Sequence, residues 1–181
     1  VLESLPSLIP GPVCWTRFEK PSFCFFFRRL FMNFPVLYLR KGAERRLRAG
    51  HLWVYSNEVD TRRSPLTEFE AGAQAELRAA NDKPMGTVFV NPHALICGRL
   101  ISRNAAHGMT PQRLTERVET ALALRERLFD KPFYRWVFGD SDGLSGLVID
   151  RFDDVVVVQI STAGMEQMLA LIHISEPTRP Y

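Results

Sequence analysis

Three aspartates and three glycines lie within one short stretch, FGDSDGLSGLVIDRF, at residues 138–152. Carboxylates at such close spacing can bind a divalent cation or act as a general acid and base. A calcium loop of the helix-loop-helix type needs an oxygen ligand at its fifth position and a glutamate at its twelfth. Counted from Asp140, those positions hold Leu144 and Arg151, so the stretch does not fit a calcium loop.

The same stretch has the composition of a turn between two strands. Paired catalytic carboxylates need a cleft and unequal surroundings, whereas Asp140 and Asp142 stand in a glycine-rich connection. Their side chains can accept hydrogen bonds from nearby backbone N–H groups, while Gly143 and Gly146 can adopt positive φ. We therefore predict a structural turn, with metal binding or acid–base work by Asp140, Asp142 and Asp150 as the alternative. On this interpretation the chain carries no catalytic residue, no cofactor-binding residue and no metal ligand.

The residues before this turn have the pattern of a small β domain. VLYLRKG (36–42) alternates apolar and polar residues, AERRLRAGH (43–51) reads as one helical turn closed by glycine, and LWVYSNEV (52–59) is a second strand. Short strands joined by Gly, Pro and Asn continue to residue 102. The pattern predicts a small closed or half-closed barrel. Trp53 stands in an apolar strand, which favours a place in the core.

The hydrophobic period changes after residue 109. Thr110 can cap a helix and Pro111 is allowed at its first position, and apolar residues then recur at helical spacing. The arginines and glutamates of this helix are expected to form a solvated face. Three strands follow, PFYRWVF, GLVIDRF and VVVVQIS, the last two joined by an Asp153-Asp154 hairpin. A second helix begins near Ala163, so the order is helix, three strands and helix.

The charge is unevenly distributed along the chain. The net charge is +3, but residues 36–63 alone carry seven Arg or Lys against three Asp or Glu. Such a local excess favours a face for an anionic partner. Three scattered cysteines fit neither a disulfide framework nor a zinc site, and their odd number favours a reducing compartment, the cytoplasm. Cys97, between apolar neighbours, is expected in the core.

Both ends of the chain differ from its body. Residues 1–31 hold four prolines and the segment FCFFFRRLF, with no apolar run long enough to cross a bilayer and no secretory signal pattern. We predict that this segment is a non-native or disordered extension. The last residues, HISEPTRPY at 173–181, break off a helical pattern with two prolines, and we interpret them as a foreign tail.

Three motifs in order resemble the ribosomal large-subunit RNA cytosine-5 methyltransferase I family. They are HLWVYSNEV (51–59), GTVFVNPHALICGRLIS (86–102) and GDSDGLSGLVIDRF (139–152), and the resemblance runs over residues 36–172. The family usually has Gly-Glu-Ser-Asp-Gly-Leu-Pro-Gly in the third motif, where Asp140 and Ser145 replace Glu and Pro here. Without that proline the unfolded chain has more conformational entropy, which lowers the stability of the fold by less than about 1 kcal/mol. The difference barely weakens the resemblance.

The resemblance implies a mixed β and α/β chain. A PUA-like β pseudobarrel that binds RNA would occupy residues 32–107, and the start of a central α/β domain residues 108–172. The Rossmann-like domain, which in the family holds S-adenosylmethionine and the nucleophilic cysteine that attacks C6 of the cytosine, is expected to be absent. The chain would thus be the RNA-binding amino-terminal part of the enzyme, inactive by itself and without its own cofactor. The alternative is a freestanding PUA-type RNA-binding or adaptor protein.

Ribosomal RNA is therefore the expected partner, with no membrane and no metal, and the oligomeric state is left open. The ends of the first and last strands of a compact barrel can lie close together, so cations from both could form one patch that binds phosphates. The predicted RNA-binding residues are Lys41, Arg45, Arg46, Arg48, His51, Arg99 and Arg103.

Overall fold

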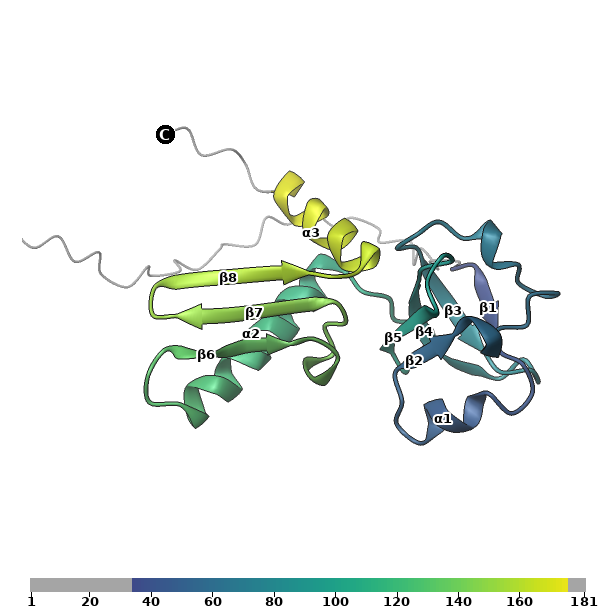
Figure 1. The fold of residues 1–181 in the computed structure, drawn as a ribbon, viewed down its shortest axis with the longest axis horizontal. Coiled ribbons are helices and arrows are strands. Elements are labelled where there is room, and N and C mark those ends of the chain that lie inside the picture. Colours follow the sequence, from purple (N-terminus) through teal and green to yellow (C-terminus); the bar gives the residue numbers. More distant parts are fainter. Residues whose placement is uncertain (1–33, 176–181) are drawn as a thin grey trace, which may run out of the picture. The chain divides into compact units, whose positions relative to one another are not determined.

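The computed structural model describes residues 34–175. The predicted extension at residues 1–31 lies outside the described residues, as does the predicted foreign tail beyond Ser175. Two sheets make up the described part, one of five strands and one of three (Figure 1). Among residues 34–175, no helix is both long enough and apolar enough to span a membrane.

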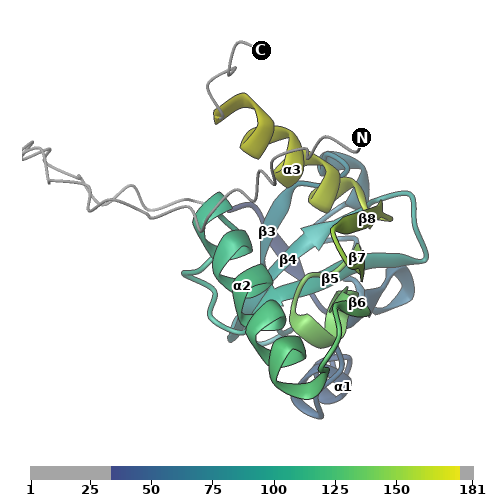
Figure 2. The same cartoon turned by 90° about the vertical axis from the view of Figure 1, so that its left-hand side faces the viewer.

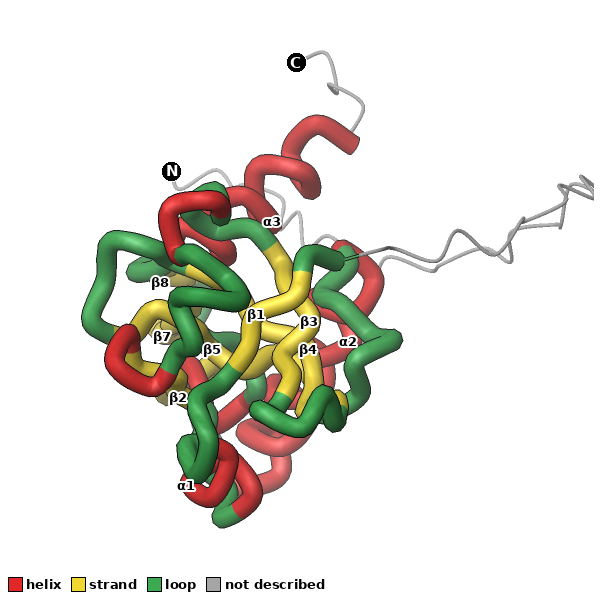
Figure 3. Tube along the Cα trace, turned by 90° about the vertical axis from the view of Figure 1, so that its right-hand side faces the viewer, coloured by secondary structure: helices red, strands yellow, loops and turns green. Residues whose placement is uncertain are grey.

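The first sheet is a half-closed barrel, as the sequence predicts (Figure 3). Its strand order is β1-β3-β4-β5-β2, with β1 and β3 parallel and the other pairs antiparallel. An antiparallel bridge between Leu39 and Val59 joins the two edges of the sheet. The strands are β1 (Val36–Tyr38), β2 (Trp53–Tyr55), β3 (Gln74–Arg78), β4 (Pro84–Val90) and β5 (Ile96–Ser102).

The interior of the barrel is apolar. Alternate residues of β3 point inward, and they meet residues of every other strand around Leu37, Val54 and Val88, which are fully buried. Cys97 is also fully buried in this core, which confirms its expected place, and burial raises the pKa of its thiol to about 11. The short helix α1 (Glu44–Arg48) closes one end of the barrel with Leu47.

The second sheet is an antiparallel meander that one helix precedes and another follows in the chain. It contains β6 (Phe133–Phe138), β7 (Leu147–Phe152) and β8 (Val155–Ile160), with α2 (Pro111–Leu128) before it and α3 (Ala163–Ser175) after it (Figure 2). The predicted cap of α2 is confirmed, because the Thr110 hydroxyl accepts a hydrogen bond from the backbone N–H of Arg113. The predicted hairpin is also confirmed, with Asp153 at φ +60° between β7 and β8.

A second apolar core connects this sheet to the barrel. Phe89 of β4 and Ile101 of β5 point out of the barrel and pack with residues of α2, β6, β7 and α3, among them Leu114 and Met165. The division predicted between residues 107 and 108 falls in the connection between β5 and α2 and stays a prediction, since the second core draws on both sides of it. β8 is exposed along its whole length although four of its six residues are valine.

Candidate nucleic-acid interface

The loop between β6 and β7 is the turn that the sequence predicts. Residues 139–142 form a 3-10 turn, and Gly143 and Gly146 have φ values of +71° and +85°. Asp142 accepts the backbone N–H of Phe138 at 2.6 Å, a contact within the turn. Among the described residues no group of three or more metal-ligating side chains gathers here or elsewhere.

The carboxylate of Asp142 also binds helix α2. Its two oxygens accept hydrogen bonds from Arg125 at 2.9 and 2.8 Å, and the side chains of the pair are 13% (Arg125) and 11% (Asp142) exposed. The expectation of a solvated charged face on α2 is therefore wrong for Arg125. It is wrong for Arg117 too, whose guanidinium donates to the carbonyl oxygens of Gly143 and Ile101. Burial lowers the pKa of Arg117.

The carboxylate of Asp140 points to the barrel instead. Its Oδ2 accepts a hydrogen bond from the indole Nε1 of Trp53 at 2.6 Å and lies 3.7 Å from Nη1 of Arg99. Its Oδ1 is buried without a hydrogen-bond partner among the described residues. Asp140 and Asp142 thus tie three parts of the fold together: the loop, α2 and the barrel.

Trp53 is not a core residue, contrary to the expectation from its apolar strand. It is 39% exposed, while its neighbour Val54 fills the barrel interior. Successive residues of a strand face opposite sides, so one inward residue in β2 forces Trp53 and Tyr55 outward. Trp53 pairs across the sheet with Arg99, whose guanidinium carbon lies 5.5 Å from the centre of the indole ring. The alternation in Trp53-Val54-Tyr55 was the signal that could have identified these two outward aromatic residues.

Four of the predicted RNA-binding residues lie exposed around α1. They form no side-chain hydrogen bond or ion pair with the described residues, and we call them the α1 basic surface: Lys41, Arg45, Arg48 and His51. Gly42 and Gly50, at φ +92° and +111°, begin and end this short segment. The left-handed backbone that glycine permits lets the chain turn sharply on both sides of one helical turn.

The other three predicted residues have structural partners. Arg46 forms an ion pair with Glu58 at 2.8 Å and lies over the ring of Tyr55, and Arg103 donates to the carbonyl of Leu47 at 2.9 Å. Arg103 therefore brings the end of β5 against the end of α1, the proximity expected from a compact barrel. Arg99 contacts Trp53 and Asp140, and no described contact joins it to α1.

Part of the chain matches a known domain, and a longer part matches known proteins. Residues 37–103 match the model of a PUA-like domain. A ribosomal RNA large subunit methyltransferase I from Alteromonas mediterranea is 32% identical over 132 residues, 71% of this chain and 32% of that protein. A ribosomal RNA large subunit methyltransferase from Deinococcus radiodurans is 31% identical over 156 residues, 79% of this chain and 38% of that protein.

Solved structures share the fold. A structure from Streptococcus mutans, named as a candidate S-adenosylmethionine-dependent methyltransferase, has a TM-score of 0.63 at 20% identity. The matched region covers 77% of this chain and 36% of the Streptococcus chain. The structure of a candidate methyltransferase complexed with SAH gives the same values. The chain thus contains a PUA-like domain, is homologous to large-subunit ribosomal RNA methyltransferases, and spans about a third of their length.

Proposed function

We propose that this chain is the RNA-binding part of an S-adenosylmethionine-dependent methyltransferase that methylates C5 of a cytosine in large-subunit ribosomal RNA. The length of the homologous region carries the proposal. Alignment with the Alteromonas relative extends over 132 residues, more than the PUA-like match at residues 37–103 can supply. The similarity therefore extends beyond the PUA-like domain, which a freestanding adaptor sharing only that domain would not need. We place the protein in the cytoplasm, with ribosomal RNA as its partner.

The α1 basic surface is the part of the barrel that we assign to RNA phosphates. Exposed cations without a protein partner can neutralise phosphates and release their counterions, and this makes binding dependent on salt. Arg46 and Arg103 act indirectly, because their bonds to Glu58 and to the Leu47 carbonyl hold α1 in place. Their contribution to RNA binding is therefore through the shape of this surface.

The described residues do not fit S-adenosylmethionine. Nucleotide cofactors of this size bind where a glycine-rich loop follows a strand and opens a helix, but the β8–α3 connection, Ser161-Thr162-Ala163-Gly164, holds a single glycine. The cavity between this connection and the barrel contains Arg99 and no carboxylate, which disfavours a cationic sulfonium there. We therefore assign cofactor binding and methyl transfer to the part of the relatives' length that residues 34–175 do not match.

RNA binding can be tested with a matched pair of double variants. Arg45→Ala/Arg48→Ala removes two cations from the α1 basic surface, and Arg127→Ala/Lys131→Ala removes two other exposed cations, one near the end of α2 and one just beyond it. Fluorescence anisotropy with transcribed fragments of large-subunit ribosomal RNA should show weaker binding for the first variant. The magnitude of the slope of log affinity against log salt concentration should decrease by about 1 to 2 units, roughly one for each lost phosphate contact. The second variant should match the unmodified chain, and equal behaviour of the two would refute the assignment.

Methyl transfer is tested through the genomic reading frame. If genomic sequence continues past the codon for Ile172 into a glycine-rich loop, the longer product should transfer a methyl group to large-subunit ribosomal RNA. Bisulfite sequencing would locate the modified cytosine, and this chain by itself should give neither transfer nor cofactor binding in calorimetry. A stop codon at that point would favour the adaptor protein instead.

A further inference from the structure

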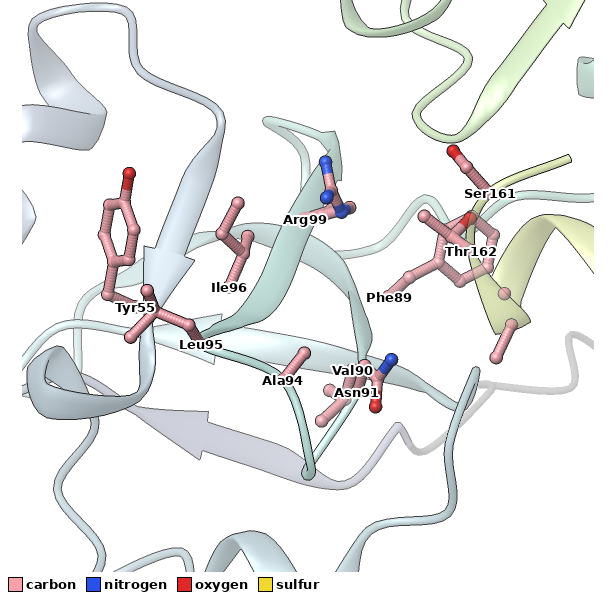
Figure 4. A pocket seen from close by; sticks show the side chains of 12 residues that line it. Tyr55, Phe89, Val90, Asn91, Ala94, Leu95, Ile96, Arg99, Ser161 and Thr162 are labelled. Carbon is pink, nitrogen blue, oxygen red and sulfur yellow. The ribbon is translucent and has the colours of Figure 1, made fainter.

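A cavity of about 450 Å³ lies between the outer face of the barrel and the start of α3 (Figure 4). Its volume is in the range of small-ligand sites. The lining comes from β2, β4, β5, the β4–β5 turn and residues 161–164. It belongs to neither the α1 basic surface nor the turn between β6 and β7.

The cavity exists because α3 covers only part of the barrel's outer face. At Gly164 the helix lies so close to β4 that an added Cβ would be 2.5 Å from the ring of Phe89. Towards the β4–β5 turn this face is more open, since Leu95 is 70% exposed and Ile96 is half-buried. The cavity wall there includes Ile96 and Tyr55, and Arg46 lies over one face of the Tyr55 ring.

Each polar side chain of the lining can donate a hydrogen bond, and none is a carboxylate. Arg99 contributes a guanidinium whose ion pair with Asp140 is long, at 3.7 Å, and leaves other N–H groups unused. The side chain of Asn91 makes no hydrogen bond with the described residues. Ser161 lies across the cavity from Tyr55 in Figure 4, with Arg99 between them in this view.

Aromatic and aliphatic walls beside a cation suit a nucleobase attached to a phosphate. Bases stack on aromatic and aliphatic side chains, and a nearby arginine holds the phosphate. Trp53 extends the same outward face of β2 next to Arg99, and it is exposed. A base inside a duplex is already stacked and paired, so it could not enter such a cavity without leaving the helix.

We propose that this cavity accepts one unpaired nucleotide of the bound RNA, with the base against Tyr55 and Ile96 and its phosphate at Arg99. This inference rests on the proposed RNA-binding function and deepens it. The α1 basic surface would supply affinity for any RNA backbone, and the cavity would supply preference for RNA with an unpaired nucleotide.

Two RNA hairpins of equal length test this preference, one fully paired and one with a single bulged nucleotide. The full chain should bind the bulged hairpin about tenfold more tightly, the effect of one stacked base. Ala94→Phe, which fills the cavity from the β4–β5 turn, and Leu95→Glu, which puts a negative charge at its exposed rim, should each abolish the preference. Leu95→Gln is the matched neutral control and should keep it, while circular dichroism checks that each variant is folded.

The outcomes separate this inference from the proposed function. Equal affinity of the full chain for both hairpins, or a preference that survives in Ala94→Phe and Leu95→Glu, would overturn the cavity assignment while leaving RNA binding intact. Free adenosine 5′-monophosphate is the third probe. If it binds as tightly as the bulged hairpin, the cavity is a site for free nucleotides and the assignment to RNA is overturned. If neither hairpin binds, both proposals fail.

Discussion

The ion pair between Arg125 and Asp142 should stabilise the second sheet far more than its position on a surface helix suggests. Both Asp142 oxygens accept a guanidinium N–H, at 2.9 and 2.8 Å, and one of them also accepts the Phe138 backbone N–H. Asp142→Ala leaves a guanidinium that is only 13% exposed without its partner. Removing one member of a buried pair costs about 3 kcal/mol, more than the loss of a single cap at about 1 kcal/mol.

A double-mutant cycle measures the interaction itself. Urea unfolding of the unmodified chain, Asp142→Ala, Arg125→Ala and the double variant should give a coupling energy of about 2 kcal/mol, the strength of a charge-assisted bidentate pair. Arg135 and Asp150 form a matched control with nearly the same geometry, at 2.8 and 3.1 Å, but with 48% and 26% of their side chains exposed. The control cycle should give a clearly smaller coupling energy, because water screens exposed charges.

Equal coupling energies for the two pairs would refute this reasoning, since burial is the difference between them. A coupling below about 0.5 kcal/mol for Arg125 and Asp142 would do the same, because it would place the pair among ordinary surface ion pairs. RNA affinity of folded Asp142→Ala should be unchanged. A loss of affinity would mean that the turn contacts RNA directly.

Three further predictions follow from single sites. Gly146→Ala should destabilise the chain by about 2 to 4 kcal/mol and Gly143→Ala by about 1 kcal/mol, as the midpoints of urea unfolding can measure. Both glycines have positive φ, but at Gly146 the new Cβ would also lie 2.7 Å from Cβ of Thr162. Cys97, with a buried thiol of pKa about 11, should react with iodoacetamide at pH 8 about 100-fold more slowly in the folded chain than in urea, as peptide mass spectrometry can measure; comparable rates would contradict its burial. The hydrogen bond from its arginine partner lowers the pKa of Asp150 in the folded chain. The ionised carboxylate therefore stabilises the fold above the pKa of the unfolded chain, near 4, and this stabilisation is lost as the pH falls through the lower pKa of the folded chain. In urea titrations the stability difference between the unmodified chain and Asp150→Asn should shrink below about pH 4, and a difference independent of pH would count against the pair.

The sequence by itself determined the features that depend on neighbouring residues. The cap of α2 at Thr110, the turn at Gly143 and the hairpin at Asp153 are confirmed, because each is set by backbone sterics or by a hydrogen bond within a few residues. The half-closed barrel and the place of Cys97 in its core are confirmed too. Strand alternation and apolar flanks carry that information at short range. The predicted RNA-binding residues stay predictions, with four of them exposed on one surface.

Tertiary structure alone decided which side of a strand faces outward and which charges find partners. Trp53 reaches Asp140 across 87 positions of sequence, and Arg46 reaches Glu58, while Arg45 and Arg48 on the same helical turn stay exposed. Neighbouring arginines look alike in a sequence, but only one of them points at an acid that arrives from a distant segment. The cavity has the same origin, because it is the part of the barrel's outer face that α3 leaves uncovered. Such contacts depend on how whole elements pack, and packing is a property of the folded chain rather than of any window of its residues.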